Sequence, residues 1–177
     1  MIETEVFMNQ KIKSVCSLPV PYPRLRVEEQ NASYAKLLSI PYASNGGELA
    51  SILFYTYGHL VTASRNERLS ELLRCISITE MRHFEILGSL IVMLGGSPRL
   101  WAADSRGCFG AQNIVYSDDS QRIIRTAISM EREAAETYKR ILGKISDGYV
   151  AEILQRIILD EEHHIKLFSE LQENARR

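Results

Sequence analysis

The sequence predicts an all-α protein, a four-helix bundle of two antiparallel helical hairpins joined by a long crossover, with an irregular proline-rich N-terminal arm. Three observations predict this fold class. Four long segments carry the apolar spacing of helices. Short connections join the first segment to the second and the third to the fourth, which makes antiparallel neighbours. The stretch Gly95–Asp118 between the second and third segments is long for a compact domain and typical of a connection that crosses the bundle.

The first element is the arm. Ser17–Pro23 carries three of the five prolines, so residues 1–30 cannot form a continuous helix. They predict an extended arm of the kind that packs on a partner subunit. A short helix is expected over Asn31–Ser39, with Pro41 as its stop. We therefore divide the chain into an arm with a short helix (1–44) and the bundle (45–177).

The four bundle helices follow in order, at Asn45–Ala63, Ser64–Leu94, Asp119–Leu142 and Tyr149–Glu173. Propensity leaves the first ambiguous because it is rich in β-branched and aromatic residues, and its length favours a helix. The second opens with a capping-box pattern at Ser64–Glu67 and ends at Gly95-Gly96-Ser97-Pro98. Ser117 and Asp118 are candidate caps for the third.

Composition argues against nucleic-acid binding, membrane insertion and a disulfide scaffold. The 177 residues fit one domain, and the net charge of −1 gives no strong field for nucleic acid or a membrane surface. No apolar run reaches the roughly 18 residues of a membrane-spanning helix, and the N-terminus lacks a signal-peptide pattern. The cysteines, Cys16, Cys75 and Cys108, are odd in number and far apart. They predict no disulfide scaffold, an apolar filler role for Cys75, and a cytoplasmic location.

The second helix places an acid and an imidazole on an apolar face. Glu80 and His83 stand three positions apart, in line with Leu73, Ile76, Phe84, Leu87 and Ile91. Burying these two polar groups without partners is costly, so partners are expected from other helices.

The fourth helix repeats the pattern in Asp160-Glu-Glu-His-His164, in one of two registers. Glu161 and His164 share a stripe with Leu154, Ile157 and Phe168, whereas Asp160 and His163 lie with Arg156 and Glu170. The apolar stripe places Glu161 and His164 inside and predicts that Asp160, His163 and Glu162 are solvated.

The remaining two helices each offer one inward acid. Glu131 lies among Ala127, Ile128, Ala135 and Tyr138, while Glu133 and Glu136 fall on a polar face. Glu48 is the first helix's acid, in line with Ile52, Tyr55 and His59, and His59 is expected to be a hydrogen-bonded core residue.

Together the helices predict a two-metal site with six ligands: Glu48, Glu80, His83, Glu131, Glu161 and His164. Carboxylates with imidazoles suit two iron or two manganese ions, with zinc as a substitute. The two hairpins echo each other, because each lone Glu has a Tyr seven residues on, Tyr55 and Tyr138. We assign these tyrosines to the catalytic machinery as hydrogen-bond donors to ligating carboxylates, with plain core packing as the open alternative.

The chain resembles the ferritin-like superfamily, in particular bacterioferritins and rubrerythrins, and is similar to short relatives of manganese catalase and to spore-coat proteins. The phrases GELASILFYTYGHL, ITEMRHFEILG, AISMEREAAETY and IILDEEHHIKLF carry the resemblance. It departs from rubrerythrins at Ala134, where they place a further Glu, and it lacks their rubredoxin CxxC pairs. Met81 matches a haem-ligating position of bacterioferritins, but nothing else in the sequence indicates a haem pocket, so haem is not expected.

The resemblance implies redox chemistry on peroxide or O2, as a peroxidase, ferroxidase or catalase, with an electron donor outside the chain. Two alternatives stay open, an iron storage or handling protein and a structural protein of the spore-coat type with a stabilising metal site. A homodimer is the expected assembly, and neither nucleic acid nor membrane is expected as a partner.

Overall fold

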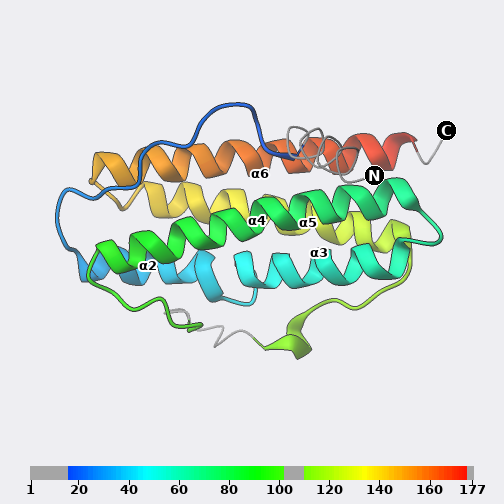
Figure 1. Ribbon diagram of the computed structural model, residues 1–177, viewed down its shortest axis with the longest axis horizontal. Helices are drawn as coiled ribbons and strands as arrows, with labels where there is room; N and C mark the ends of the chain where they lie inside the picture. The colour runs from blue at the N-terminus through cyan, green and yellow to red at the C-terminus, as the bar shows by residue number, and fades with distance from the viewer. Residues whose placement is uncertain (1–15, 102–109, 175–177) are drawn as a thin grey trace, which may run out of the picture.

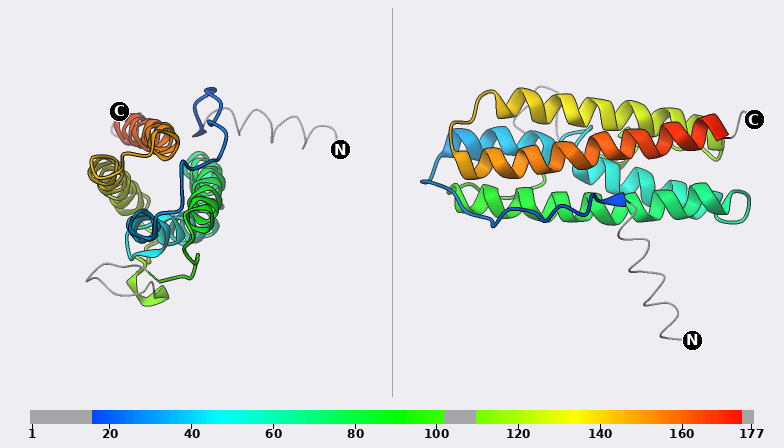
Figure 2. Two further views of the ribbon diagram at one scale, coloured as in Figure 1. Left: turned by 90° about the vertical axis from the view of Figure 1, so that its left-hand side faces the viewer. Right: turned by 90° about the horizontal axis from the view of Figure 1, so that it is seen from above.

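The computed structural model describes residues 16–101 and 110–174, and it confirms the all-α four-helix bundle (Figure 1). Helix α3 packs against α4, and α5 packs against α6, so the two hairpins pair as predicted (Figure 2). The described part of the crossover between α4 and α5 includes a 3-10 turn, η1 (Ala111–Asn113). The helices are α2 (Ala32–Ala43), α3 (Glu48–Thr62), α4 (Glu67–Met93), α5 (Ser120–Leu142) and α6 (Gly148–Asn174).

Side-chain caps fix the helix starts. The predicted capping box at Ser64 is wrong by two residues, because α4 begins after Asn66, whose side chain accepts from the Leu69 N–H. Asp119 caps α5 in the same way, through the N–H groups of Gln121 and Arg122. At the end of α4 the chain reverses through Gly95, whose φ of +81° suits a residue without a Cβ.

Helix α2 continues through Pro41, so the prediction that Pro41 stops it is wrong. Pro41 lies in the final turn, where its missing N–H removes one hydrogen bond only, and the helix ends two residues later at Ala43. Gly47 then lies so close to the Pro41 carbonyl that a Cβ would stand 2.4 Å from the oxygen. This tight connection restarts the chain as α3 with Glu48 as its first helical residue.

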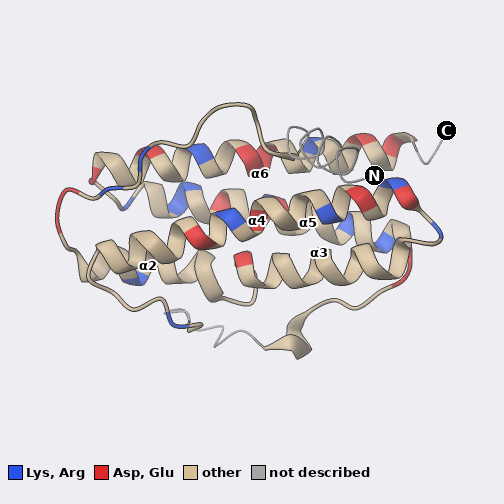
Figure 3. Cartoon of the chain, viewed as in Figure 1, with Lys and Arg blue, Asp and Glu red and all other residues tan. Residues whose placement is uncertain are grey.

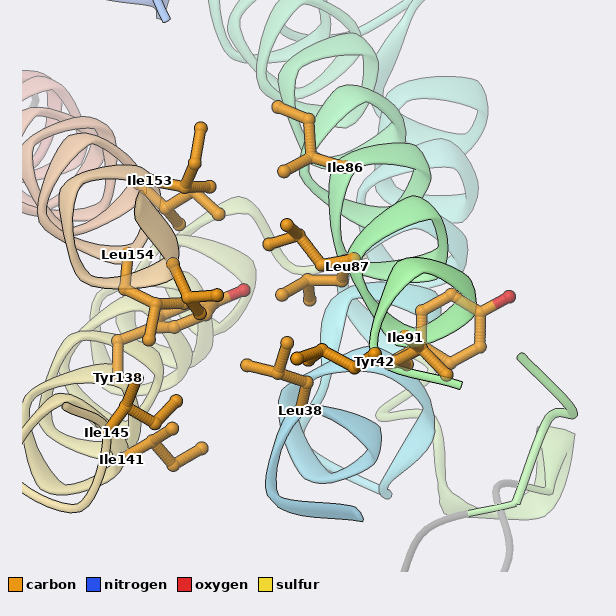
Figure 4. Packing of buried hydrophobic residues seen from close by; sticks show 14 of the residues in the cluster. Leu38, Tyr42, Ile86, Leu87, Ile91, Tyr138, Ile141, Ile145, Ile153 and Leu154 are labelled. Atoms are coloured by element: carbon orange, nitrogen blue, oxygen red, sulfur yellow. The ribbon is translucent and has the colours of Figure 1, made fainter. Parts of the chain in front are cut away.

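The apolar core is divided into two clusters along the bundle axis. On α4, residues of one cluster (Leu69–Ile76) precede Glu80 and His83, and residues of the other (Ile86–Leu94) follow them. Helices α5 and α6 change cluster at Glu131 and at Glu161–His164 in the same way. Figure 4 shows the cluster that contains Leu38, Leu87, Tyr138 and Leu154. The buried acids and imidazoles at the middle of the bundle therefore lie between the two apolar clusters.

Charge is distributed unevenly over the helices. Lys, Arg, Asp and Glu occur along α4, α5 and α6, whereas α3 carries a charged residue only at its start (Figure 3). Among the described helices, none is both long and apolar enough to cross a membrane.

The described part of the N-terminal arm lies along its own bundle, beside α4 and α6 (Figure 2). Arg156 of α6 donates to the carbonyls of Leu18 and Val20 at 2.9 and 2.8 Å. Tyr22 packs against the core, with the guanidinium of Arg82 over its ring. The part of the predicted arm over residues 1–15 lies outside the described residues.

A disulfide joins Cys16 of the arm to Cys75 of α4, with their Cα atoms 5.9 Å apart. The prediction that Cys75 is an unpaired apolar filler is therefore wrong. Both side chains are buried, as expected of a filler, but the course of the arm brings a second sulfur to the same place. The crosslink ties the arm to the helix that carries Glu80 and His83.

Candidate metal centre

The six predicted ligands converge at the middle of the bundle. They form two overlapping groups, in each of which one ligand atom per residue lies within 4.8 Å of the others. Every member is buried. Glu80 and Glu161 belong to both groups, which is the arrangement expected of carboxylates that bridge two metal positions. The first group is Glu48, Glu80, His83 and Glu161, and the second is Glu80, Glu131, Glu161 and His164.

The two imidazoles face the carboxylates with the same nitrogen. His83 Nδ1 lies 3.0 Å from Glu161, 3.3 Å from Glu80 and 3.8 Å from Glu48. His164 Nδ1 lies 3.0 Å from Glu80, 3.4 Å from Glu131 and 3.7 Å from Glu161. Each Nδ1 thus faces the two shared carboxylates and one carboxylate of its own. This gives each metal position one nitrogen and three carboxylate groups.

The helix positions explain why these side chains meet. Glu80 and His83 on α4, and Glu161 and His164 on α6, are each three residues apart and therefore share one helix face. Glu48 reaches the site because α3 starts there, and the N-terminus of a helix favours a carboxylate.

The two predicted tyrosines bond across the hairpins. Tyr55 of α3 donates to Glu131 of α5, and Tyr138 of α5 donates to Glu48 of α3. Both rings are fully buried. Each unshared carboxylate is therefore oriented by a phenol from the opposite half.

The outer nitrogens of the imidazoles bond to the arm. His83 Nε2–H donates to the Tyr22 hydroxyl at 2.8 Å, and this hydroxyl donates to Asp160 at 2.5 Å. His164 Nε2–H donates to the backbone carbonyl of Cys16 at 2.7 Å. Such partners fix which nitrogen carries the proton and leave Nδ1 free to bind a metal.

Asp160 is buried, so the prediction that it is solvated is wrong. Arg156 lies 2.8 Å from one of its oxygens, and the Leu18 N–H and Ser17 hydroxyl of the arm also donate to it. Burial opposes its charge, but hydrogen bonds from His83, Tyr22 and Arg156 hold the pKa of Asp160 well below its usual range. The arm closes over this side of α6, and helix periodicity alone does not predict that cover.

The other acids lie as predicted, since Glu133, Glu136 and Glu162 are exposed. His163 was predicted to be solvated but is half-buried. His59 Nδ1 bonds to the Ser70 hydroxyl at 2.8 Å, and His59 is in neither ligand group.

Burial and mutual repulsion shift the ionisation of the site. Burial, followed by the charge of Glu80, raises the pKa of Glu48 and of Glu131 well above the usual range. Burial would lower the imidazole pKa values, but the carboxylates outweigh it and raise the pKa of His83 and of His164. Without a metal, protons must therefore compensate the buried negative charge.

Buried polar atoms without hydrogen bonds indicate whether the six residues fit divalent ions. Both carboxylate oxygens of Glu161, Oε1 of Glu80 and Nδ1 of His164 make no hydrogen bond. Some of these atoms lie close enough for ion pairing, as the distances above show, but without hydrogen-bond geometry. Buried polar atoms without hydrogen bonds are rare, and among the described residues the one further case is Nη1 of Arg156, which is ion-paired with Asp160. The oxygen and nitrogen chemistry of the candidate ligands suits iron or manganese, so these residues fit a pair of such ions.

Solved structures with the same fold include a manganese catalase and a bacterioferritin. KatB, a manganese catalase from Anabaena PCC7120, superposes with a TM-score of 0.81 at 21% identity, over 90% of this chain and 80% of that one. The bacterioferritin of Desulfovibrio desulfuricans, which has a diiron site, gives a TM-score of 0.70 at 22% identity, over 82% of this chain and 81% of that one. At such identities the likeness shows the fold.

Sequence similarity identifies the family of this chain. An uncharacterized protein of Archaeoglobus fulgidus is 42% identical over 50 residues, which is 28% of this chain and 78% of that protein. The ferritin-like domain family matches residues 46–177, which include all six candidate ligands. This chain therefore belongs to the ferritin-like family.

Proposed function

We propose that this chain is a di-metal carboxylate oxidoreductase that acts on peroxide or O2. The observation that carries the proposal is the pair of overlapping ligand groups, which share Glu80 and Glu161 and are closed by one imidazole each. Two iron or manganese ions bound there would supply the electrons that reduce an O–O bond. The structural neighbours that are a manganese catalase and a diiron bacterioferritin support this class of chemistry.

The protein's own residues have distinct tasks in this proposal. Glu80 and Glu161 would contribute to both metal positions, and Glu48 and Glu131 would each complete one position. The Tyr138 and Tyr55 hydroxyls orient these last two carboxylates by hydrogen bonds. The apolar clusters on either side exclude water from the site, which strengthens its electrostatic interactions.

A small pocket lies beside Glu48, and in this proposal it is where a small oxidant approaches the site. Ala134 lines this pocket together with Gly47 and Thr137. Its small dimensions favour peroxide or O2 over a larger substrate. Electrons for repeated reduction would come from a separate donor, whereas disproportionation of peroxide needs none.

The test is metal content followed by turnover. Protein produced with iron and manganese both present should hold about two of these ions per chain, measured by mass spectrometry. The dominant ion then selects the assay: peroxide reduction and iron oxidation for iron, peroxide disproportionation for manganese. Near-zero metal, or a single zinc, would overturn the proposal.

Two neighbouring acids on α5 provide a matched pair of variants. Glu131→Ala should lower the content to one ion or fewer per chain, because it removes the unshared carboxylate of one position. Glu133→Ala, an exposed acid two residues on, should keep both ions. Equal loss in the two variants would show that the proposed ligand set is wrong.

The size of the assembly separates the enzyme from the storage alternative. We propose a homodimer of about 40 kDa, twice the chain mass of 20.1 kDa, and light scattering after size exclusion measures it. A large assembly that takes up many irons per chain would favour storage. Two ions that resist oxidation and reduction, but whose removal unfolds the protein, would favour the structural role.

A further inference from the structure

The N-terminal arm contacts both imidazoles of the site. Residues 16–22, here called the strap, provide the Cys16 carbonyl for His164 and the Tyr22 hydroxyl for His83. These are the hydrogen bonds that hold Nδ1 of each ring toward the carboxylates. The two imidazoles therefore depend on one segment that is remote from them in sequence.

The two contacts are anchored differently. Tyr22 is held by its bond to Asp160, by Arg156 at 4.3 Å from the ring centre, and by Arg82 on α4. These anchors do not involve the disulfide. The Cys16 carbonyl belongs to the residue whose sulfur is bonded to Cys75. Cys75 lies on α4 five residues before Glu80, so the crosslink ties the carbonyl to α4 beside the site. The next residues of the strap, Ser17 and Leu18, bond to Asp160 of α6.

We propose that the strap is a positioning element of the metal centre and that the Cys16–Cys75 disulfide is its latch, which controls the metal position of His164 selectively. With the disulfide formed, the Cys16 carbonyl holds His164 against Glu131. With the disulfide reduced, Cys16 loses its covalent link to α4 and is held only through the contacts of Ser17 and Leu18 with α6, so its carbonyl is fixed less firmly against His164. The His83 position keeps its ion because Tyr22 stays anchored. This inference rests on the proposed two-metal site.

A dithiol can reduce the Cys16–Cys75 disulfide, and hydrogen peroxide can form it again. A dithiol reduces the S–S bond to two thiols, transfers two electrons and two protons, and becomes a disulfide itself. Hydrogen peroxide reverses the step by taking two electrons and two protons from the thiols and forming two waters. Both sulfurs are buried, so exchange requires the end of the strap to open.

The experiment compares one chain in two redox states, with Mn²⁺ as the probe. Metal-free protein is reduced with dithiothreitol, desalted without oxygen so that the reductant cannot bind metal, and loaded with Mn²⁺. Peptide mass spectrometry verifies the state of the Cys16–Cys75 crosslink. Release of Mn²⁺ to a chelator is then followed for the oxidised and the reduced chain.

We expect two slowly released ions per oxidised chain. In the reduced chain, one of the two should leave roughly 10–100 times faster, the scale at which loss of a partner behind a ligating imidazole acts. Cys75→Ser should behave like the reduced chain and should not respond to dithiothreitol. Glu131→Ala removes the ligand unique to the His164 position, so the one ion left should be insensitive to reduction.

Tyr22→Phe reverses the selectivity, because it keeps the ring but removes the nearer outer partner of His83 and leaves only the longer 3.4 Å contact of Nε2 with Asp160. It should make the His83 position labile in the oxidised chain. Tyr34→Phe is its matched control, since this hydroxyl accepts from the Ser146 N–H away from the site and both ions should stay slow. If circular dichroism shows that reduction unfolds the bundle, the Tyr22→Phe result decides the role of the strap.

Three outcomes have distinct meanings. If the oxidised chain binds no Mn²⁺ and no iron, the proposed function fails before the latch is tested. If it binds two ions whose release is unchanged by reduction, the latch is wrong and the proposed function stands. If reduction releases both ions equally fast, selectivity for the His164 position is wrong and the inference is overturned in this form.

Discussion

At the residue scale, the two halves of the bundle exchange their tyrosines. Tyr55 and Glu48 belong to α3, yet Tyr55 donates to Glu131 and Tyr138 donates to Glu48. The carboxylate of one half thus depends on the phenol of the other. Burial, followed by the nearby carboxylates, raises the pKa of both phenols well above 10, so they stay protonated as donors.

Removing one of these hydroxyls should loosen one metal position. We expect Tyr138→Phe to weaken the affinity of the Glu48 position for Mn²⁺ by roughly 10–100-fold, because the ring still packs but the carboxylate loses its donor. Titration calorimetry measures this effect. Tyr57, whose half-buried ring packs on Tyr116, provides the control, and Tyr57→Phe should bind both ions normally. An unchanged affinity in Tyr138→Phe would make this tyrosine a packing residue only.

Proton release provides a second prediction at this scale. The raised pKa values of Glu48, Glu131, His83 and His164 mean that the metal-free site holds protons to higher pH than ordinary groups do. Ligands bind metal in their deprotonated form, so binding expels protons and the apparent affinity must rise with pH. Calorimetry in buffers of different ionisation enthalpy, from about pH 6 to 8, measures the protons released. Binding without proton release would contradict this protonation state.

Sequence periodicity predicted which side chains meet, but not what covers them. The apolar stripes of α4, α5 and α6 predicted the positions of Glu80, Glu131 and Glu161. Asp160 was missed because its neighbours on α6, Arg156 among them, are polar and indicate a solvated face. An i, i+4 pair of Arg and Asp is the only local signal of such a buried ion pair, and exposed helices carry the same spacing.

At the element scale, the break between α2 and α3 positions Glu48. The helix boundaries that caps and glycines mark were predicted to within a few residues. The break was not, because the sequence signal at Pro41 indicates an earlier stop than the chain makes. What decides the geometry is the close approach of Gly47 to the Pro41 carbonyl, a tertiary contact within the connection.

Two adjacent glycines test this role of the break. In Gly47→Ala the new Cβ would overlap the Pro41 carbonyl, so the connection must shift and carry Glu48 with it. We expect a loss of roughly 1–3 kcal/mol in the free energy of unfolding and weaker binding of one metal ion. In Gly46→Ala the Cβ meets Glu133 at an ordinary 3.7 Å, so stability and metal content should stay unchanged. Denaturant unfolding and metal analysis check both variants.

At the scale of the whole molecule, the path of the arm is the feature that the sequence predicts least well. Its proline content correctly excluded a continuous helix over Ser17–Pro23. Its path could not be predicted, because it depends on contacts such as Arg156 to Val20 that are remote in sequence. The disulfide followed from that path, since Cys16 and Cys75 are 59 positions apart and have no shared motif. The odd number of cysteines therefore led to the wrong prediction that Cys75 is unpaired.

The buried polar layer at the site destabilises the metal-free bundle. The two apolar clusters enclose this layer of carboxylates and imidazoles, several of whose atoms lack hydrogen bonds. Such a layer costs stability when only protons compensate its charge. Divalent ions that bind the folded state alone must then stabilise the bundle by mass action.

Thermal unfolding should therefore depend on metal. Mn²⁺ at about 100 times its dissociation constant stabilises the folded state by about 2.7 kcal/mol, which raises the Tm of a chain of this size by roughly 5–11 °C. Calorimetry with Mn²⁺ and with a chelator measures the difference. Because binding expels protons, the gap must widen as pH rises, and a gap that narrows would contradict the protonation argument. Glu133→Ala should reproduce the wild-type gap, while Glu131→Ala should lose at least half of it, because the stabilisation comes from the buried ligands and not from surface acids.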